Sequence, residues 1–204
     1  MIKNSTLYPL FPTIVYKSSL DRELTPTEIT EIYSTEVFEQ GLGNEISSSS
    51  WILDNPIFSN LKNELMLHVH SYMKELMKIE IDLYMTNSWI NVTGFQKQHS
   101  AHNHTNSILS GVYYFKTSDS QPNISFNRLT PPFFLNMKAT EYTPANSIEW
   151  TVPVEDGEII IFPSTCFHYV KPNLTQNERI SIAFNTFARG TIGAEFQGAD
   201  LELK

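Results

Sequence analysis

The chain changes its pattern of apolar and polar residues at about residue 80. Beyond that point, short runs rich in β-branched and aromatic residues alternate with turn-forming residues, a spacing typical of antiparallel sandwiches and barrels. We therefore expect strands at residues 81–92, 108–116, 123–127, 148–152, 158–162, 167–171 and 180–187.

The segment before residue 80 carries helical signals instead. Thr25, Pro26 and Glu28 form a capping sequence, because threonine can cap a helix, proline suits the first helical position, and Glu28 can return a hydrogen bond. Apolar residues then recur at helical spacing, which predicts a helix over residues 26–38. We also expect an edge strand at residues 7–16, which contain two prolines, and a loop at residues 41–50.

A longer helix is expected after the sequence Asp54-Asn55-Pro56. His68 and His70 lie on it about 200° apart, so they cannot share a metal ion, and we interpret both as ordinary surface or boundary residues. The helix is predicted from one apolar stripe, which comprises Leu61, Leu65, Val69, Tyr72, Leu76 and Ile79.

The order of these elements predicts one mainly β domain with N-terminal helices over residues 1–204. Because the helices precede the strands, we expect them to pack against one face of a sheet. Residues 1–80 would supply a strand and the supporting helices, residues 81–189 the β-rich core, and residues 190–204 a C-terminal tail.

Composition narrows the functional classes. The chain has 204 residues, 41% hydrophobic and 18% charged, as in globular proteins. Its net charge of −8 disfavours general nucleic-acid binding. Cys166 is the only cysteine, so no intrachain disulfide can form, and no apolar run is long enough to cross a membrane. With no signal-peptide pattern at its start, the chain is expected to be a soluble cytoplasmic protein without a membrane partner.

Three of the six histidines, His99, His102 and His104, fall within six residues. In an extended segment, His102 and His104 point to the same side and can bind one metal ion. His168, in the strand-rich half, can supply a third ligand, and three protein ligands leave other coordination positions open. His99 stands three residues before His102, so an extended segment would point it the other way.

Two other interpretations of this region stay open. The histidines could be polar residues of a solvent-exposed loop, because a single H-x-H pair is weak evidence for a metal. Cys166 would share the side of His168 in an extended segment, and a thiolate is a good soft ligand. Isolated cysteines, however, are more often small buried apolar residues.

A second candidate site begins at Arg179. Alternation places Arg179, Ser181 and Ala183 on one face of a strand and Ile180, Ile182 and Phe184 on the other. An arginine and a hydroxyl on one face can bind a carboxylate through a charge-assisted fork and a hydrogen bond. The alternative is an arginine that faces water or pairs with Glu178 or Glu155.

Taken together, these residues resemble the 2-oxoglutarate/Fe(II)-dependent oxygenases, and more narrowly a bacterial and phage branch that is related to the prolyl hydroxylases. The resemblance covers most of the chain, and its combination of motifs is specific although each motif alone is not. The motifs are Leu10–Pro12, Trp89–Asn91, His102–His104, Ser107–Tyr114, Gly157–Ser164, His168 and Arg179–Asn185.

The resemblance implies a double-stranded β-helix, also called a jelly roll or cupin-like fold, and a hydroxylating dioxygenase. It implies Fe(II) held by His102, His104 and His168, and 2-oxoglutarate as co-substrate, with its far carboxylate on Arg179 and Ser181. Tyr114 and Asn91 would line the same pocket. The catalytic set would then be His102, His104, His168 and Arg179, acting on a prolyl, other peptidyl or small-molecule C–H bond.

The chain departs from the broad family at His104, where most members carry an acid. Three neutral imidazoles leave the charge of the metal uncompensated, and such a site suits Zn²⁺, Ni²⁺ and Cu²⁺ at least as well as Fe²⁺. The alternatives are a three-histidine metalloenzyme without 2-oxoglutarate and a non-catalytic jelly roll with a structural metal. Jelly rolls of this size often dimerise, which makes a homodimer a candidate state.

Overall fold

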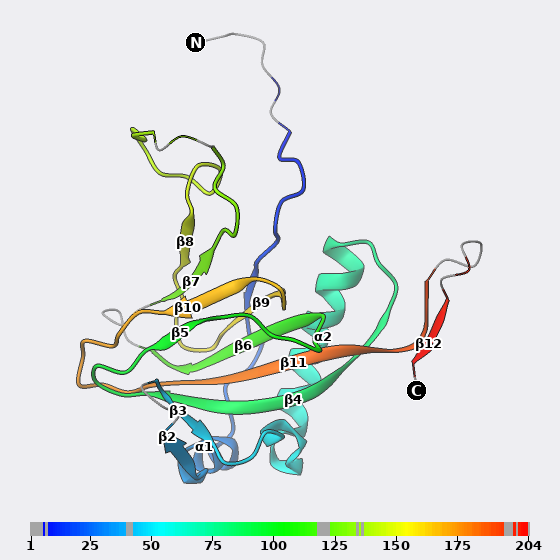
Figure 1. Cartoon of the computed structure of the whole chain (residues 1–204). Helices are drawn as coiled ribbons and strands as arrows, with labels where there is room; N and C mark the ends of the chain where they lie inside the picture. Colours follow the sequence, from blue (N-terminus) through cyan, green and yellow to red (C-terminus); the bar gives the residue numbers. More distant parts are fainter. Residues whose placement is uncertain are drawn as a thin grey trace.

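Two antiparallel β-sheets form the body of the protein in the computed structural model, which describes residues 6, 8–39, 43–117, 123–133, 135, 137–193, 198 and 200–203. Among these residues, the larger sheet has the order β1-β9-β6-β11-β4-β3-β2, with β12 paired to β11, and the smaller sheet has the order β5-β10-β7-β8 (Figure 1). The larger sheet comprises β1 (Tyr16–Ser19), β2 (Val37–Glu39), β3 (Glu45–Ser47), β4 (Asp82–Thr93), β6 (Leu109–Lys116), β9 (Glu158–Pro163), β11 (Arg179–Ile192) and β12 (Leu201–Leu203). The smaller sheet comprises β5 (His99–His102), β7 (Ile124–Asn127), β8 (Glu149–Val152) and β10 (Phe167–Val170).

From β4 to β11 the chain passes back and forth between the two sheets. Strands β4, β6, β9 and β11 belong to the larger sheet, whereas β5, β7, β8 and β10 belong to the smaller one. The chain changes sheet after each of these strands except between β7 and β8, which pair with each other in the smaller sheet. This arrangement of eight consecutive strands in two facing sheets is the double-stranded β-helix, so the predicted fold is confirmed. The seven strands expected from the sequence pattern are all present, with bounds shifted by one residue or a few.

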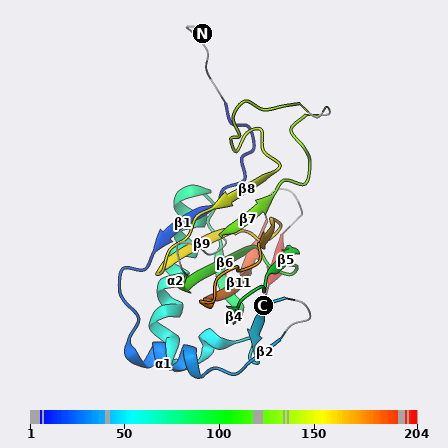
Figure 2. The same ribbon diagram turned by 90° about the vertical axis from the view of Figure 1, so that its left-hand side faces the viewer.

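Helices cover the outer face of the larger sheet. They are α1 (Pro26–Ser34), the 3₁₀ turns η1 (Ile52–Asp54) and η2 (Pro56–Phe58), α2 (Ser59–Ser71) and the π-helical turn η3 (Tyr72–Leu76) (Figure 2). Alternate residues of β9 separate the two sides: Ile159 and Ile161 pack in the core cluster that contains the helices, whereas Ile160 and Phe162 pack toward the smaller sheet. No described helix is long and apolar enough to cross a membrane.

Strand β11 lies between β4 and β6 in the larger sheet and is buried on both faces over most of its length. Ile180, Ile182 and Phe184 belong to the helix-side core, as the alternation of the sequence predicted. Phe184 lies opposite Gly111 of β6, and a Cβ on Gly111 would stand 2.1 Å from the Phe184 ring. Only glycine therefore fits at position 111, because any side chain would collide with this ring.

The predicted helix start at Thr25 is confirmed, but the helix ends earlier than expected. The Thr25 hydroxyl accepts from the Glu28 backbone N–H, and Glu28 accepts in return from the Thr25 backbone N–H. The helix ends at Ser34, and residues 37–39 form β2, which pairs with β3 inside the segment expected as a loop. Pairing with another strand outweighed the local helical spacing there, so the prediction for residues 35–38 was wrong.

The second helix is also shorter than its apolar stripe. Leu61, Leu65, Val69 and Tyr72 are buried as expected, but Leu76 is exposed at the end of the π-helical turn and Ile79 lies beyond it. The change of helical pitch at Tyr72 explains this, because a wider turn rotates later residues away from the sheet.

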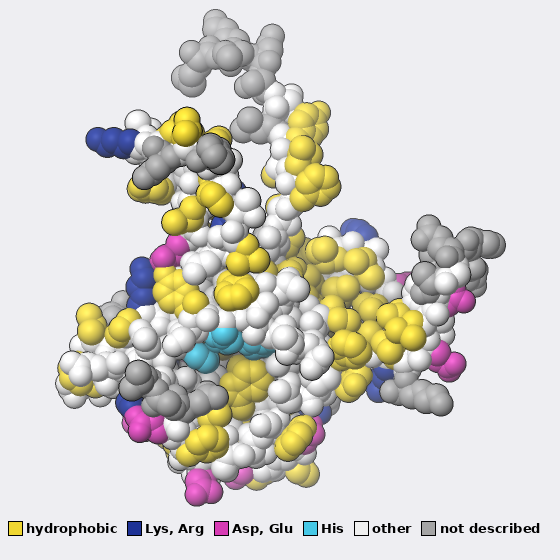
Figure 3. Space-filling view, in the orientation of Figure 1, with side chains coloured by type: hydrophobic (Ala, Val, Ile, Leu, Met, Phe, Trp, Pro, Cys, Tyr) yellow, Lys and Arg dark blue, Asp and Glu magenta, His cyan; other side chains and the backbone are white. Residues whose placement is uncertain are grey.

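The two ends of the chain differ from the sequence prediction. Residues 8–15 form no strand; residues 8–13 extend away from the body and include exposed apolar side chains, of which Phe11 is 96% exposed, whereas Ile14 and Val15 pack against the core (Figures 1 and 3). The expected edge strand is instead β1, which pairs with β9. In the expected tail, residues 190–192 prolong β11 and residues 201–203 form β12, which pairs back onto it.

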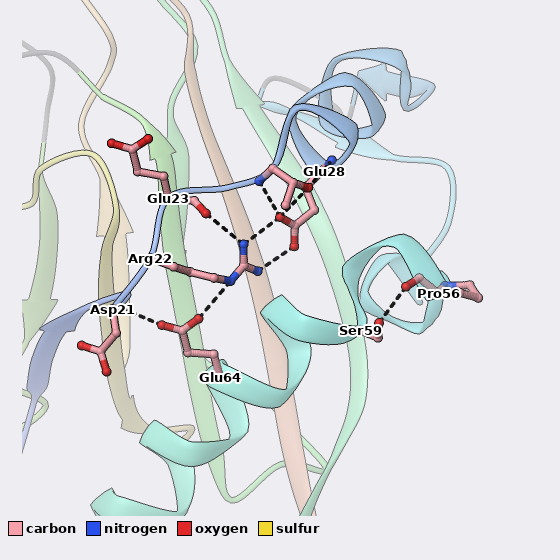
Figure 4. Close-up of polar contacts among 8 residues, drawn as sticks. Asp21, Arg22, Glu23, Glu28, Pro56, Ser59 and Glu64 are labelled. Atoms are coloured by element: carbon pink, nitrogen blue, oxygen red, sulfur yellow. Dashed lines mark hydrogen bonds and ion pairs between the residues drawn. The ribbon is translucent and has the colours of Figure 1, made fainter.

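A partly buried ion-pair network fixes α1 to α2 on the helix side (Figure 4). The guanidinium of Arg22 donates to both carboxylate oxygens of Glu28 and lies 3.3 Å from Glu64 of α2. The backbone N–H of Asp21 also donates to Glu64, at 2.6 Å. Burial would raise the pKa of Glu28, but hydrogen bonds from Arg22 and Thr25 outweigh it and hold that pKa below its usual value.

Candidate active site

One cavity between the two sheets is lined by all seven residues that the sequence predicted to form the site. Its wall includes His102, His104 and His168 at one end and Asn91, Tyr114, Arg179 and Ser181 at the other. Histidine side chains are visible at the centre of the face shown in Figure 3. The residues that line the cavity include no aspartate or glutamate. The structure therefore brings together two groups of residues that lie up to about 90 positions apart in the chain.

The three histidines form one cluster. One ring nitrogen of each of His102, His104 and His168 lies within 4.8 Å of one ring nitrogen of each of the others. His102 and His168 are opposite each other in the pairing of β5 with β10, and their ring centroids are 4.3 Å apart. His104 follows β5, and its backbone N–H donates to Ser164 O at 2.9 Å, which ties it to the turn before β10. Nitrogen atoms this close can share one metal ion.

Oxygen acceptors fix the orientation of each imidazole. Nδ1 of His102 lies 2.7 Å from Ser100 O, and Nδ1 of His168 lies 3.0 Å from Cys166 O. Because a carbonyl oxygen can only accept, each Nδ1 carries the proton and donates, which leaves Nε2 with its lone pair. Both rings are thus set in the tautomer that binds metal through Nε2.

His104 obtains the same tautomer from a side chain. Its Nδ1 lies 2.5 Å from Asn185 Oδ1 of β11, and the Ser110 hydroxyl donates to the same oxygen at 2.7 Å. Ser110 also bonds to Ser164, which in turn donates to Ser107. All of these side chains are wholly or largely buried. A buried polar chain of this kind holds the His104 ring in one orientation.

Burial favours the uncharged forms of His168 and His104. It lowers the pKa of His168 to about 3, although the hydrogen bond to Cys166 opposes the shift and the neighbouring histidines add to it. Burial also lowers the pKa of His104, against the opposing hydrogen bond with Asn185. A neutral imidazole is the form that coordinates metal, so burial favours the metal-binding form of these two residues.

His99 does not face away from the cluster, which corrects the sequence prediction. Val170 pairs with His99 and His168 with His102, so β5 has one more residue than β10 between these pairs. This bulge reverses the alternation of side chains, and the His99 ring centroid lies 4.7 Å from that of His102. His99 lines the cavity but lies outside the group of three that can share an ion.

Among the described residues, Cys166 likewise does not belong to the group of three histidines whose nitrogen atoms can share a metal ion. Its side chain packs against the core between the two sheets, and burial raises the pKa of its thiol to about 11. Thiolate is the form that binds metal, so this cysteine matches the description of a small buried apolar residue.

The other end of the cavity collects hydrogen-bond donors from three strands. In the register of the larger sheet, Ser181 of β11 lies opposite Asn91 of β4 on one side and Tyr114 of β6 on the other. The guanidinium carbon of Arg179 lies 4.9 Å from the centroid of the Tyr114 ring. Arg179 is only 5% exposed, so it does not face water as the alternative interpretation supposed.

Burial shifts both of these groups toward their uncharged forms. It lowers the pKa of Arg179, an effect that the nearby Tyr114 opposes. It raises the pKa of Tyr114, and here the charge of Arg179 opposes the shift. Arginine nevertheless stays protonated in proteins, so this end of the cavity keeps a buried positive charge beside a neutral phenol.

Several residues of the site had no role predicted from the sequence. Asn185 shares the alternation of Arg179, Ser181 and Ala183, so extending that pattern by one step would have identified it. Trp89 lines the cavity with its ring centroid 5.7 Å from that of His104. Asn44, which bonds to Asn91, had no signal in the sequence, because its position depends on the pairing of β3 with β4.

Comparison with known proteins agrees with this architecture. The model of a family described as "Putative 2OG-Fe(II) oxygenase" matches residues 87–185. A search of curated proteins found no match. Among solved structures, HygX from Streptomyces hygroscopicus with nickel, 2-oxoglutarate and hygromycin B bound is 11% identical, with a TM-score of 0.61 over 90% of this chain and 84% of that one.

Two further solved structures share the fold. The non-heme alpha ketoglutarate dependent epimerase SnoN from nogalamycin biosynthesis is 12% identical, with a TM-score of 0.63 over 91% of this chain and 83% of that one. A Pseudomonas putida prolyl-4-hydroxylase is 14% identical, with a TM-score of 0.53 over 87% and 94%. Residues 87–185, the segment that matches the model of the 2-oxoglutarate/Fe(II)-dependent oxygenase family, contain all seven residues predicted to form the site.

Proposed function

We propose that this protein is an Fe(II)- and 2-oxoglutarate-dependent dioxygenase that hydroxylates a C–H bond of a second substrate. The observation that carries the proposal is one cavity with three imidazoles at one end and a buried arginine, serine, tyrosine and asparagine at the other. 2-Oxoglutarate matches both ends, because it has a chelating keto-acid group and a distal carboxylate.

The histidine end fits a catalytic metal. His102, His104 and His168 would hold Fe(II) through their Nε2 atoms, and three protein ligands leave positions for the keto-acid group. Among the described residues no acid lines the cavity, so the dianionic co-substrate would supply the negative charge that the ligands lack. When bound, the iron would supply the redox chemistry that converts 2-oxoglutarate and O₂ into succinate and CO₂ and hydroxylates the substrate.

The arginine end would bind the distal carboxylate. Arg179 offers a planar fork of N–H donors that matches a carboxylate, and Ser181 and Tyr114 offer hydroxyl groups from adjacent strands. Asn91 can add an amide donor from the other side of Ser181. Because these groups lie on three paired strands, the sheet itself sets the distance between the carboxylate and the metal.

Apolar side chains separate the site from water. Val112, Ile124, Val170 and Ala183 line the cavity between its polar ends. A water-poor environment strengthens the charge interactions of the co-substrate and limits side reactions. The cavity has a volume of about 30 Å³, which is room for about two waters. Binding therefore requires side chains that line the cavity to move.

The proposal is tested by adding Fe(II) and 2-oxoglutarate to the purified protein without oxygen. We expect a weak absorption band in the green that appears only when both are present, and succinate on exposure to air. A three-histidine metalloenzyme that does not use 2-oxoglutarate would bind the metal but give neither signal. A jelly roll with a structural metal would bind the metal without an exchangeable position.

The second substrate is proposed at the level of a class. A prolyl, other peptidyl or small-molecule C–H bond is supported by the fold shared with a prolyl-4-hydroxylase and with HygX, which was solved with hygromycin B bound. Fold alone does not transfer a substrate. The homodimer, the single domain and the cytoplasmic location stay predictions of the sequence.

A further inference from the structure

Asn91 is held by two partners that lie outside the set of residues predicted from the sequence. Its Oδ1 accepts a hydrogen bond from Trp89 Nε1 at 3.2 Å and from Asn44 Nδ2 at 2.8 Å. Asn44 immediately precedes β3 and is 1% exposed. Asn91 is also buried, and it lines the cavity opposite Ser181.

Two independent groups fix the direction of these hydrogen bonds. An indole N–H can only donate, so the atom of Asn91 that faces Trp89 must be its oxygen. A backbone carbonyl can only accept, and Asn44 Nδ2 lies 3.2 Å from Glu45 O, so the Asn44 amide must present its nitrogen. The two requirements agree with each other and leave one orientation for both amides.

We infer that Asn44 is a positioning residue that, together with Trp89, holds Asn91 with its Nδ2 toward the distal carboxylate of 2-oxoglutarate. This inference rests on the proposed function. The oxygen of Asn91 is turned toward Asn44 and Trp89, so the opposite side of the planar amide is the donor. It stands in the same cross-strand row as the hydroxyls of Ser181 and Tyr114.

The orientation matters because a flipped amide would oppose binding. With Oδ1 toward the cavity, Asn91 would place a partial negative charge beside the carboxylate instead of a donor. Asn44 lies outside residues 87–185, the segment that matches the family model. The β2–β3 hairpin therefore acts on the co-substrate through Asn91, although it is not one of the eight strands of the double-stranded β-helix.

The substitution Asn44→Asp tests this inference. An ionised aspartate has the same shape but can only accept, so it attracts the Nδ2 of Asn91 and turns the amide over. The affinity for 2-oxoglutarate should fall about 10-fold or more. It is measured by titrating the Fe(II)-loaded protein without oxygen and following the absorption band in the green. The affinity for 2-oxopentanoate, which has the same keto-acid end and no distal carboxylate, should not change.

A double-mutant cycle separates positioning from a direct charge effect. In the Asn91→Ala background, Asn44→Asp should change the affinity for 2-oxoglutarate by less than about 2-fold, because the group it acts through is gone. An equal loss in that background, or an equal loss for 2-oxopentanoate, would overturn the inference.

Ser47→Ala provides the matched control. Ser47 is buried in the same hairpin and accepts from the backbone N–H of Ile90, but no hydrogen bond joins it to Asn91 among the described residues. This variant should lower thermal stability and leave the affinity for 2-oxoglutarate unchanged. If the parent protein itself bound no 2-oxoglutarate, the proposed function would fail; normal binding in Asn44→Asp would overturn only the role of Asn44.

Discussion

Strand β11 has two faces that perform different tasks with alternate residues of one sequence. Toward the helices it presents Ile180, Ile182 and Phe184, which are apolar and close-packed. Toward the smaller sheet, Arg179 and Ser181 of β11 line the cavity. On the same face, Asn185 accepts a hydrogen bond from His104, one of the three clustered histidines. The first face stabilises the sheet by burying apolar area, whereas the second buries polar groups, which costs free energy unless partners satisfy them.

The difference separates stability from ligand binding within one element. Substitutions on the helix side should weaken the fold and leave ligand affinity unchanged. Substitutions on the cavity side should change ligand affinity with little loss of stability, because functional polar groups are rarely optimal for folding.

The largest effect is expected for His168→Ala. Loss of one of three ligands should weaken Fe(II) binding by more than about 100-fold. Substituting a residue that only orients a ligand weakens metal binding by at most about that factor. Metal content after dialysis, measured by elemental analysis, checks this. Retention of Fe(II) at parental affinity would mean that another group, such as His99, completes the site.

Arg179→Met should abolish the carboxylate anchor while keeping the length of the side chain. We expect the free energy of 2-oxoglutarate binding to weaken by roughly 2–5 kcal/mol, about 30-fold to several-thousand-fold. Because burial disfavours the charge of Arg179, the melting temperature of the ligand-free protein should not fall. Unchanged affinity for 2-oxoglutarate would refute the assignment of Arg179.

Leu65→Ala tests the helix side of the comparison. Leu65 of α2 is 0% exposed, so its truncation should lower the free energy of unfolding by about 2–5 kcal/mol. Urea denaturation measures this loss, and the affinity for 2-oxoglutarate at a temperature where the variant is folded should match that of the parent. A parallel loss of affinity would show that the two faces of the sheet are coupled.

Asn185→Ala should have an intermediate effect that is confined to the metal. Without the Asn185 side-chain oxygen, His104 loses the acceptor that fixes its ring, and Fe(II) affinity should fall about 10- to 100-fold. At saturating Fe(II), the affinity for 2-oxoglutarate should recover, which distinguishes this variant from Arg179→Met. Competition with a metal chelator gives the affinity.

The smallest effect is expected for Glu28 on the helix side, whose contribution to stability depends on pH. The pKa of Glu28 is held below its usual value, so its contribution to stability is present above the unfolded-state pKa and is lost as pH falls through the lower folded-state pKa. Glu28→Gln should be less stable than the parent by about 1 kcal/mol at pH 7. The difference should shrink on acidification below about pH 4 in urea denaturation experiments. A difference that is constant with pH would contradict this role of Glu28.

The sequence predicted those parts of the fold that depend on local pattern. The capping residues Thr25 and Glu28, the seven β-rich runs and the alternation along β11 all produced the expected local structure. The end of α1 and the strands β2 and β3 were missed, because short strands there depend on partners that are distant in the sequence.

Within the site, alternation succeeded where the strand was regular and failed where it was bulged. Arg179 and Ser181 lie as their spacing predicted, on the part of β11 that pairs regularly with β4. The predicted direction of the His99 side chain was wrong, because one extra residue in β5 reverses the alternation of side chains. A bulge leaves no mark in the spacing of the histidines themselves, so only the pairing with β10 reveals it.

The most direct test of the account is an anomalous-scattering map at the iron edge from crystals grown without oxygen in Fe(II) and 2-oxoglutarate. We predict one iron site bound by Nε2 of His102, His104 and His168, with the keto-acid group of 2-oxoglutarate on the iron and its far carboxylate on Arg179. An iron that excludes His104 in favour of His99 or Cys166, or a 2-oxoglutarate that does not reach Arg179, would contradict it.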